Sequence, residues 1–184
     1  MNSPLIILIA ALTGILTDYC MYRVLNPEKY PFTVVIAILN CIILMKAFDD
    51  PLMILKGLIF SQSLIATGYC DVKTHEIPDL ILLPVAAAGF INFQLLFSLE
   101  GLVSMSVLFY IIALFTHEEG LGGGDVKLAA ATGFAIGPIA NIAGVMFGSV
   151  LFLLVYFIFF RKKKTYAMAP WLGSGCFLAY VLLC

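Results

Sequence analysis

Charged side chains are scarce in this sequence. Its 184 residues include 10 Lys and Arg and 11 Asp and Glu, which is 11% of the chain, whereas 62% is hydrophobic. A soluble domain is about half apolar and about a quarter charged. A chain of this size cannot hide so much apolar surface from water, so the composition predicts a membrane protein in contact with the lipid bilayer. The formal net charge of −1, without a basic stripe, gives no indication of nucleic-acid binding.

The sequence also lacks any C-x-x-C pair. The spacing needed for a zinc site or a thioredoxin-like redox motif is therefore absent. We expect no metal, and we expect buried, unpaired thiols. The five cysteines are Cys20, Cys41, Cys70, Cys176 and Cys184.

Long apolar runs are abundant and predict one all-α domain, residues 1–184, built as a polytopic bundle of about eight transmembrane helices. A spanning helix needs roughly 17–25 apolar residues. The first run lacks a basic start and a cleavage site, so we interpret it as a membrane helix and not a signal peptide. We expect the chain to turn at Glu100, and to break at Gly137-Pro138 because proline interrupts a helix. The expected spans are 4–22, 32–48, 51–70, 79–98, 101–116, 126–137, 138–160 and 167–184.

Most basic residues fall on one side of this arrangement. Four alternate connections hold eight of the ten, and the positive-inside rule places such connections in the cytoplasm. Both termini are then expected outside. The eight residues are Arg23, Lys29, Lys73, Lys127, Arg161, Lys162, Lys163 and Lys164.

Two aspartates stand at the expected ends of helices on this same side. Asp71 directly follows one apolar run, and Asp125 directly precedes another. Two such carboxylates, close enough to share one proton, form an aspartyl pair. One takes a proton from water as it attacks a peptide carbonyl, while the other protonates the leaving amine. The pair titrates as a unit, so the sequence assigns no individual role.

Three glycines precede Asp125. Gly122, Gly123 and Gly124 permit positive φ and close approach of a substrate backbone, although glycines alone are more typical of a flexible turn. The Walker pattern is absent, because an aspartate follows the last glycine where that pattern has Lys and then Ser or Thr.

Two stretches in this order, "DVKTHEIPDLILLP" and "GGGDVKL", resemble the type 4 prepilin peptidases, a family of GxGD-type intramembrane aspartic peptidases. The resemblance implies an aspartic endopeptidase of the bacterial cytoplasmic membrane that needs no cofactor. Its substrate would be a prepilin or pseudopilin, cut at the cytoplasmic face between a short leader and an apolar helix. Type IV pilus, type II secretion and competence substrates all remain open.

The resemblance also implies residue roles. Asp71 and Asp125 would be catalytic, and the three glycines, Lys127, Pro78 and Asp79 would bind substrate or support the site. From the residues alone, Asp79 is expected to cap the fourth helix. Lys127 is expected either to orient Asp125 or to extend towards lipid headgroups.

One departure from the family is large. Many members carry a cytoplasmic domain with two C-x-x-C pairs after the first helix, and this chain has only a short connection there. This argues for a short form without N-methyltransferase activity. Asp18, followed by Asn26, is an alternative partner for Asp125, because some short relatives begin with such a loop.

Two other classes of function also fit acidic residues in a membrane protein. One is a small proton-coupled transporter, which would hold its acids deep within the spans. The other is a non-catalytic subunit of a pilus or secretion assembly, which would tolerate loss of either aspartate.

Overall fold

The structure is a computed structural model that describes residues 3–25, 33–115, 122–159 and 166–184. The described residues form α-helices and one 3-10 helix, with no strand among them, which confirms the all-α prediction. The elements are α1 (Ser3–Leu25), α2 (Thr33–Ala47), α3 (Pro51–Thr74), α4 (Asp79–Ala87), η1 (Ala88–Phe90), α5 (Leu95–Phe115), α6 (Gly123–Ile136), α7 (Pro138–Phe159) and α8 (Ala169–Leu183).

Local sequence explains where several helices begin and end. Asp50 caps the start of α3, where its side chain accepts a hydrogen bond from the N–H of Leu52. At the other end, the C-cap residue His75 has a left-handed backbone conformation. Gly137 ends α6 with a φ of 81° and Pro138 starts α7, so the predicted break is confirmed. Proline suits a first helical position because that N–H has no intrahelical partner.

The predicted turn at Glu100 is wrong. The chain turns at residues 91–94, where Asn92 adopts a φ of 58°, and Glu100 lies inside α5. Asn tolerates the left-handed region, whereas Glu favours a helix interior. The fourth span therefore ends at Phe90, earlier than expected.

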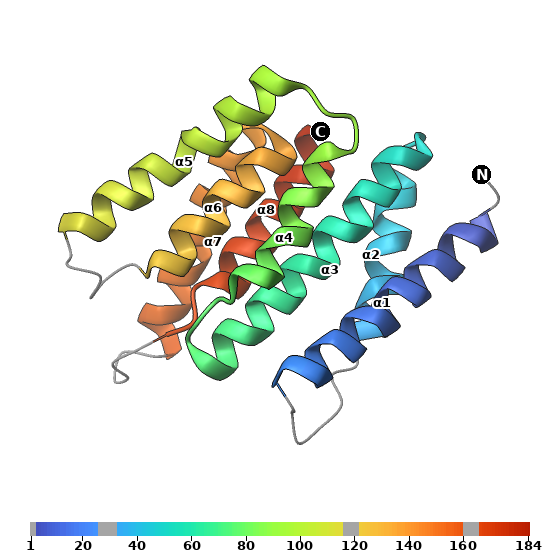
Figure 1. Ribbon diagram of the computed structural model, residues 1–184, viewed down its shortest axis with the longest axis horizontal. Helices are drawn as coiled ribbons and strands as arrows, with labels where there is room; N and C mark the ends of the chain where they lie inside the picture. Colours follow the sequence, from blue (N-terminus) through green and yellow to red (C-terminus); the bar gives the residue numbers. More distant parts are fainter. Residues whose placement is uncertain (1–2, 26–32, 116–121, 160–165) are drawn as a thin grey trace.

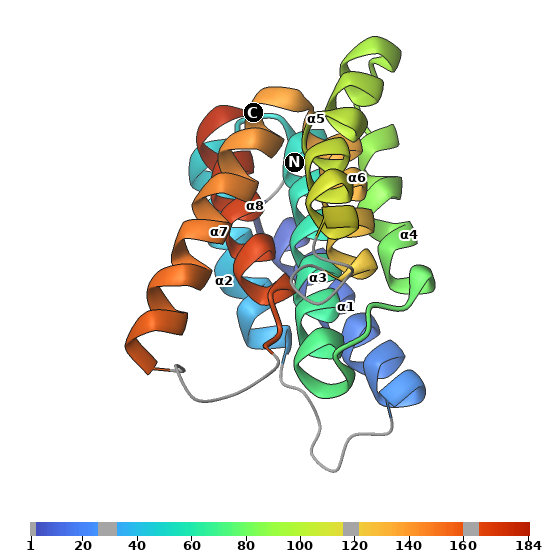
Figure 2. The ribbon, with the colours of Figure 1, turned by 90° about the vertical axis from the view of Figure 1, so that its left-hand side faces the viewer.

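The helices pack side by side as a bundle (Figure 1). α3 lies near the centre, in contact with α1, α2, α4 and α8, while α5 packs on α6 and α7 packs on α8 (Figures 1 and 2). Within the described residues, four helices are long and apolar enough to cross a membrane: Pro4–Arg23, Pro51–Thr74, Leu95–Phe115 and Pro138–Ile158. Thr33–Ala47, Asp79–Phe90 and Ala169–Leu183 are shorter apolar helices.

Large apolar side chains remain exposed along α1, α5 and α7, as expected for helices that face lipid. The interior contains a buried polar cluster around Asn141, whose amide nitrogen donates to the Gly101 and Ala129 carbonyls and to Ser104 Oγ. Thr132 Oγ1 donates to the amide oxygen of the same Asn141. The cluster joins α5, α6 and α7, and these features together define a helical membrane bundle.

Candidate functional site

Asp71 is positioned by two helices. It lies in the last turn of α3 instead of after the helix, and its side chain is buried. Oδ2 accepts the backbone N–H of Ala169, the first residue of α8, at 2.8 Å. Met168, at the N-cap position of α8, provides no side-chain cap. The carboxylate therefore satisfies an N–H that would otherwise lack a partner.

Asp125 lies in the first turn of α6, ahead of the apolar residues that the sequence predicts to enter the bilayer, and not in a loop before the helix. Burial, and then the neighbouring Asp71 carboxylate, raise the pKa of Asp125 to about 7. Its Oδ1 is buried without a hydrogen-bond partner among the described residues. The two predicted aspartates therefore lie within electrostatic reach of each other, with one oxygen of Asp125 unengaged by described protein groups.

The glycines do not use positive φ. Gly122 has a φ of −73° at the N-cap of α6, Gly123 and Gly124 belong to the helix, and Gly137 is the one described glycine with positive φ. A Cβ on Gly124 would lie 3.2 Å from Ile77, whereas one on Gly123 would meet no described atom within 4 Å. Gly124 therefore lets the start of α6 approach the α3–α4 connection, and the described residues leave space around Gly123 at the start of the helix.

Lys127 and Asp79 form an ion pair. Lys127 Nζ lies 2.7 Å from Asp79 Oδ1, and both side chains are largely exposed. The prediction that Asp79 caps α4 is wrong, because Pro78 occupies the N-cap position and no side-chain cap forms. The helix begins one residue earlier than a cap at Asp79 requires, so Asp79 is its first helical residue and its carboxylate turns towards α6. Lys127 links α6 to α4 through Asp79.

Asp18 is engaged with another helix. Its Oδ1 accepts the backbone N–H of Thr33 at 3.0 Å and the Thr33 hydroxyl at 2.6 Å, and the side chain is buried. It thus joins α1 to the first residue of α2. Asn26, its expected companion, lies outside the described residues.

The described residues contain no group of three His, Cys, Asp or Glu able to hold a metal ion. All five cysteines are free, as predicted, but Cys20 and Cys184 are exposed. Lys29, Glu118, Glu119 and residues 161–164 lie outside the described part of the chain.

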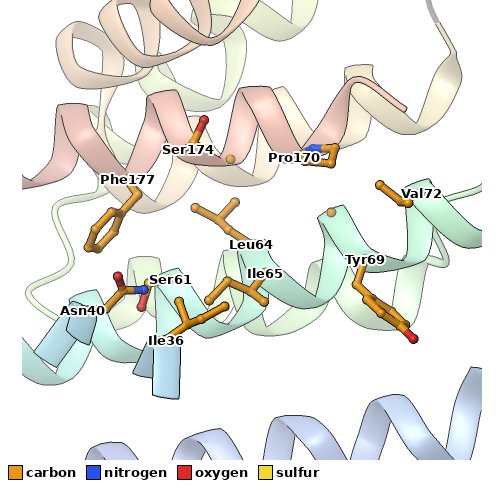
Figure 3. Close-up of a pocket in the computed structure, with 12 residues that line it drawn as sticks. Ile36, Asn40, Ser61, Leu64, Ile65, Tyr69, Val72, Pro170, Ser174 and Phe177 are labelled. Carbon is orange, nitrogen blue, oxygen red and sulfur yellow. The ribbon is translucent and has the colours of Figure 1, made fainter. Parts of the chain in front are cut away.

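Sequence reasoning missed two parts of the site. One is the start of α8 at Ala169, for which the only local signal is Pro170 ahead of an apolar run. The other is a groove of about 430 Å³ between α2, α3 and α8 (Figure 3). It reaches Val72 and Pro170, the residues that directly follow Asp71 and Ala169.

The fold and the site define a class: an all-α membrane protein with two interacting carboxylates at one end of its bundle. Residues 58–160, more than half of the chain, match the Type IV leader peptidase family. The protein therefore belongs to that family.

Relatives named "Prepilin leader peptidase/N-methyltransferase" are similar to this chain. The relative from Bacillus subtilis (strain 168) is 32% identical over 146 residues, 73% of this chain and 58% of its own. The one from Neisseria gonorrhoeae is 33% identical over 128 residues, 63% of this chain and 44% of its own. The chain spans about half the length of these curated relatives. No solved structure matches significantly.

Proposed function

We propose that this protein is an aspartic endopeptidase that removes the leader from type IV prepilins or pseudopilin-like precursors. The observation that carries the proposal is the electrostatic interaction between Asp71 at the end of α3 and Asp125 at the start of α6. We call these two residues the candidate pair. The names of the relatives supply the substrate class.

In the proposed reaction the candidate pair holds one proton. Its ionised carboxylate takes a proton from a water molecule while the water oxygen bonds to the scissile carbonyl carbon. The protonated carboxyl donates a hydrogen bond to the carbonyl oxygen, where negative charge develops, and keeps its proton at this step. When the C–N bond breaks, the departing nitrogen receives a proton from the pair. The products are a carboxylic acid and an amine, and the pair again holds one proton.

Neighbouring groups support these steps. The Ala169 N–H donates to Asp71 Oδ2 and so fixes the orientation of this carboxylate. Asp125 Oδ1 has no described partner to displace before it meets a substrate. No described atom lies within 4 Å of a Cβ placed on Gly123, so an extended backbone can approach the start of α6 there. Preorganised groups of this kind avoid reorganisation during the reaction.

We place the protein in the bacterial cytoplasmic membrane with the candidate pair facing the cytoplasm. The support is the positive-inside bias of the connections that flank the pair. The N-methyltransferase activity in the relatives' names is not proposed for this chain, because it lacks the C-x-x-C pairs of the domain linked to that activity.

The transporter and assembly-subunit hypotheses fit less well. A proton path needs acids along the depth of the spans, whereas both members of the candidate pair lie at helix ends, in the last turn of α3 and the first turn of α6. An assembly subunit gives no reason to bring two carboxylates together, since the repulsion between like charges is unfavourable.

Coexpression with a prepilin tests the proposal. The parent should convert the precursor to a shorter product, and Asp71→Asn and Asp125→Asn should each abolish conversion. Asp18→Asn should leave conversion near the parent level, because Asn retains an oxygen that can accept from Thr33. Conversion at the parent rate by either Asp71→Asn or Asp125→Asn would refute the assignment of the candidate pair as catalytic. If Asp71→Asn converts the precursor and Asp18→Asn does not, Asp18 would replace Asp71 as the partner of Asp125.

A further inference from the structure

Among the described residues, the lining of the groove between α2, α3 and α8 is uncharged. Leu64 and Ile65 lie along its floor, and Asn40, Ser61 and Ser174 supply neutral polar groups (Figure 3). The Ser61 hydroxyl donates to Leu58 O and the Ser174 hydroxyl to Trp171 O, so both serines are satisfied within their own helices. A molecule that binds in this groove therefore needs neither charge nor an array of hydrogen-bonding groups, so the lining suits an apolar occupant.

The groove runs along a helix that is long and apolar enough to cross a membrane. Its floor runs along α3, one of the helices able to cross a membrane, from Ser61 to Val72. At 1.5 Å per residue this is a length of about 16 Å, roughly half the thickness of the hydrocarbon core. The end at Val72 is the polar end, because Lys73 Nζ lies 5.9 Å from the centroid of the Tyr69 ring that lines it.

At this polar end the groove reaches the chain neighbours of Asp71 and Ala169, although neither of these two residues lines it. Gly68 and Val72, which flank Asp71 on α3, both line the groove, as does Pro170, the neighbour of Ala169. A Cβ on Gly68 would lie 3.1 Å from Pro170 Cα, so glycine brings α3 and α8 close together there. Figure 3 shows Val72 and Pro170 together at one end, with Asn40, Ser61 and Phe177 at the other.

We propose that this groove seats an apolar, membrane-embedded helix of the protein substrate, on one side of the bond that is cut. The proposal rests on the proposed function and identifies the surface that selects the substrate. A helix lying against Leu64 and Ile65 would deliver the adjoining peptide to Asp71 without leaving the bilayer. Ser174, which is exposed and lines the groove, is the kind of small residue that lets a second membrane helix pack closely. A lipid chain is the competing occupant, and it gains nothing from a groove that ends at Val72 and Pro170, next to the hydrogen bond between Asp71 and Ala169.

A photocrosslinking pair tests the occupant. Phe177 lines the groove, while Phe157 is an exposed phenylalanine on α7. Each is replaced by p-benzoylphenylalanine in an Asp125→Asn background, which keeps a bound precursor uncut. We expect Phe177→p-benzoylphenylalanine to crosslink to the apolar segment of the precursor and Phe157→p-benzoylphenylalanine not to do so. Equal crosslinking at both positions, or crosslinks from position 177 to lipid only, would overturn the proposal.

Filling the groove tests its contribution to specificity. Ser174 is exposed, so Ser174→Phe projects into the groove without entering the core, and Ser106→Phe, at a half-buried serine on α5 that does not line the groove, is the control. We expect Ser174→Phe to raise KM for the full precursor about tenfold, a change of about 1.4 kcal/mol, with kcat near that of the parent. Cleavage of a precursor peptide shortened to the leader and a few following residues should be equal in both variants.

The outcomes separate this proposal from the one on which it rests. If the parent cuts no precursor, the proposed function is wrong, and the groove has no substrate to select. If the parent cuts the precursor but Ser174→Phe has the parent KM, the groove proposal is wrong and the peptidase assignment stands. Thermal melting of both serine variants verifies that each is folded.

Discussion

Asp71 Oδ2 and the Ala169 backbone nitrogen, 98 positions apart, are joined by a buried hydrogen bond of 2.8 Å. A side chain from α3 thus caps α8, whose own N-cap residue, Met168, offers no capping group. The same carboxylate would serve both in holding two helices together and in the chemistry. Its structural and chemical contributions should therefore be separable by substitution.

Asp71→Asn and Asp71→Ala should both be inactive but differ in stability. The amide oxygen of Asn can still accept from Ala169, whereas Ala leaves a buried N–H without a partner, at a cost of about 1–3 kcal/mol. Thermal melting in detergent should place Asp71→Asn near the parent and Asp71→Ala clearly below it. Equal melting temperatures for the two variants would show that the hydrogen bond contributes little.

Stability should fall as pH rises from about 4 to about 7 because of Asp125. The pKa of this group is raised from 3.8 to about 7 in the folded protein. Between these values the folded protein keeps a proton that the unfolded chain releases, so folding is favoured at the acidic end. Melting temperature measured from pH 4 to pH 8 should decline more steeply in the parent than in Asp125→Asn. Identical slopes would contradict the raised pKa.

Activity should decline above about pH 7 for the same reason. The proposed reaction needs one proton on the candidate pair, and that proton is lost when Asp125 ionises. Rates measured across this range at saturating precursor should show the loss. A rate that keeps rising to pH 9 would exclude a requirement for the shared proton.

Lys127→Glu and Asp79→Lys should each weaken the ion pair that links α6 to α4 and so lower stability slightly. The double variant, in which the two charges are exchanged, should restore the ion pair. Each single change places two like charges where an ion pair at 2.7 Å stood. Because both side chains are largely exposed, the effect on stability should stay at or below about 1 kcal/mol and shrink in high salt. Melting temperatures and cleavage rates at low and high salt measure it. A double variant no better than the worse single variant would show that the pair is not coupled.

Gly101→Ala should destabilise the contact between α5 and α6, while Gly123→Ala should leave the fold unchanged. A Cβ on Gly101 would overlap the carbonyl of Gly133, whereas no described atom lies within 4 Å of a Cβ on Gly123. Overpacking of this kind costs about 1–3 kcal/mol. Melting temperatures compare the two, and a stable Gly101→Ala protein would mean that the helices can separate without penalty.

The sequence predicted the features that depend on local chemistry. Carboxylates are costly in a membrane, so Asp71 and Asp125 were conspicuous in an apolar chain, and Gly137-Pro138 broke a helix as its chemistry requires. The turn was misplaced because Glu100 suits a helix, and Asn92 marked the true turn. The hydrogen bond between Asp71 and the Ala169 backbone N–H was not predictable from the sequence. Such a contact depends on how the helices pack and leaves no pattern in the types of side chain.

The most direct test of the central claim is the cleavage rate of purified Asp71→Asn, Asp125→Asn and the double variant, measured on one precursor. Groups that act as a unit lose their whole contribution when either is removed. The account predicts that all three variants lose the same large factor in rate, so that the second substitution adds nothing to the first. Independent losses that multiply in the double variant, or a single variant at the parent rate, would contradict a shared catalytic role for Asp71 and Asp125.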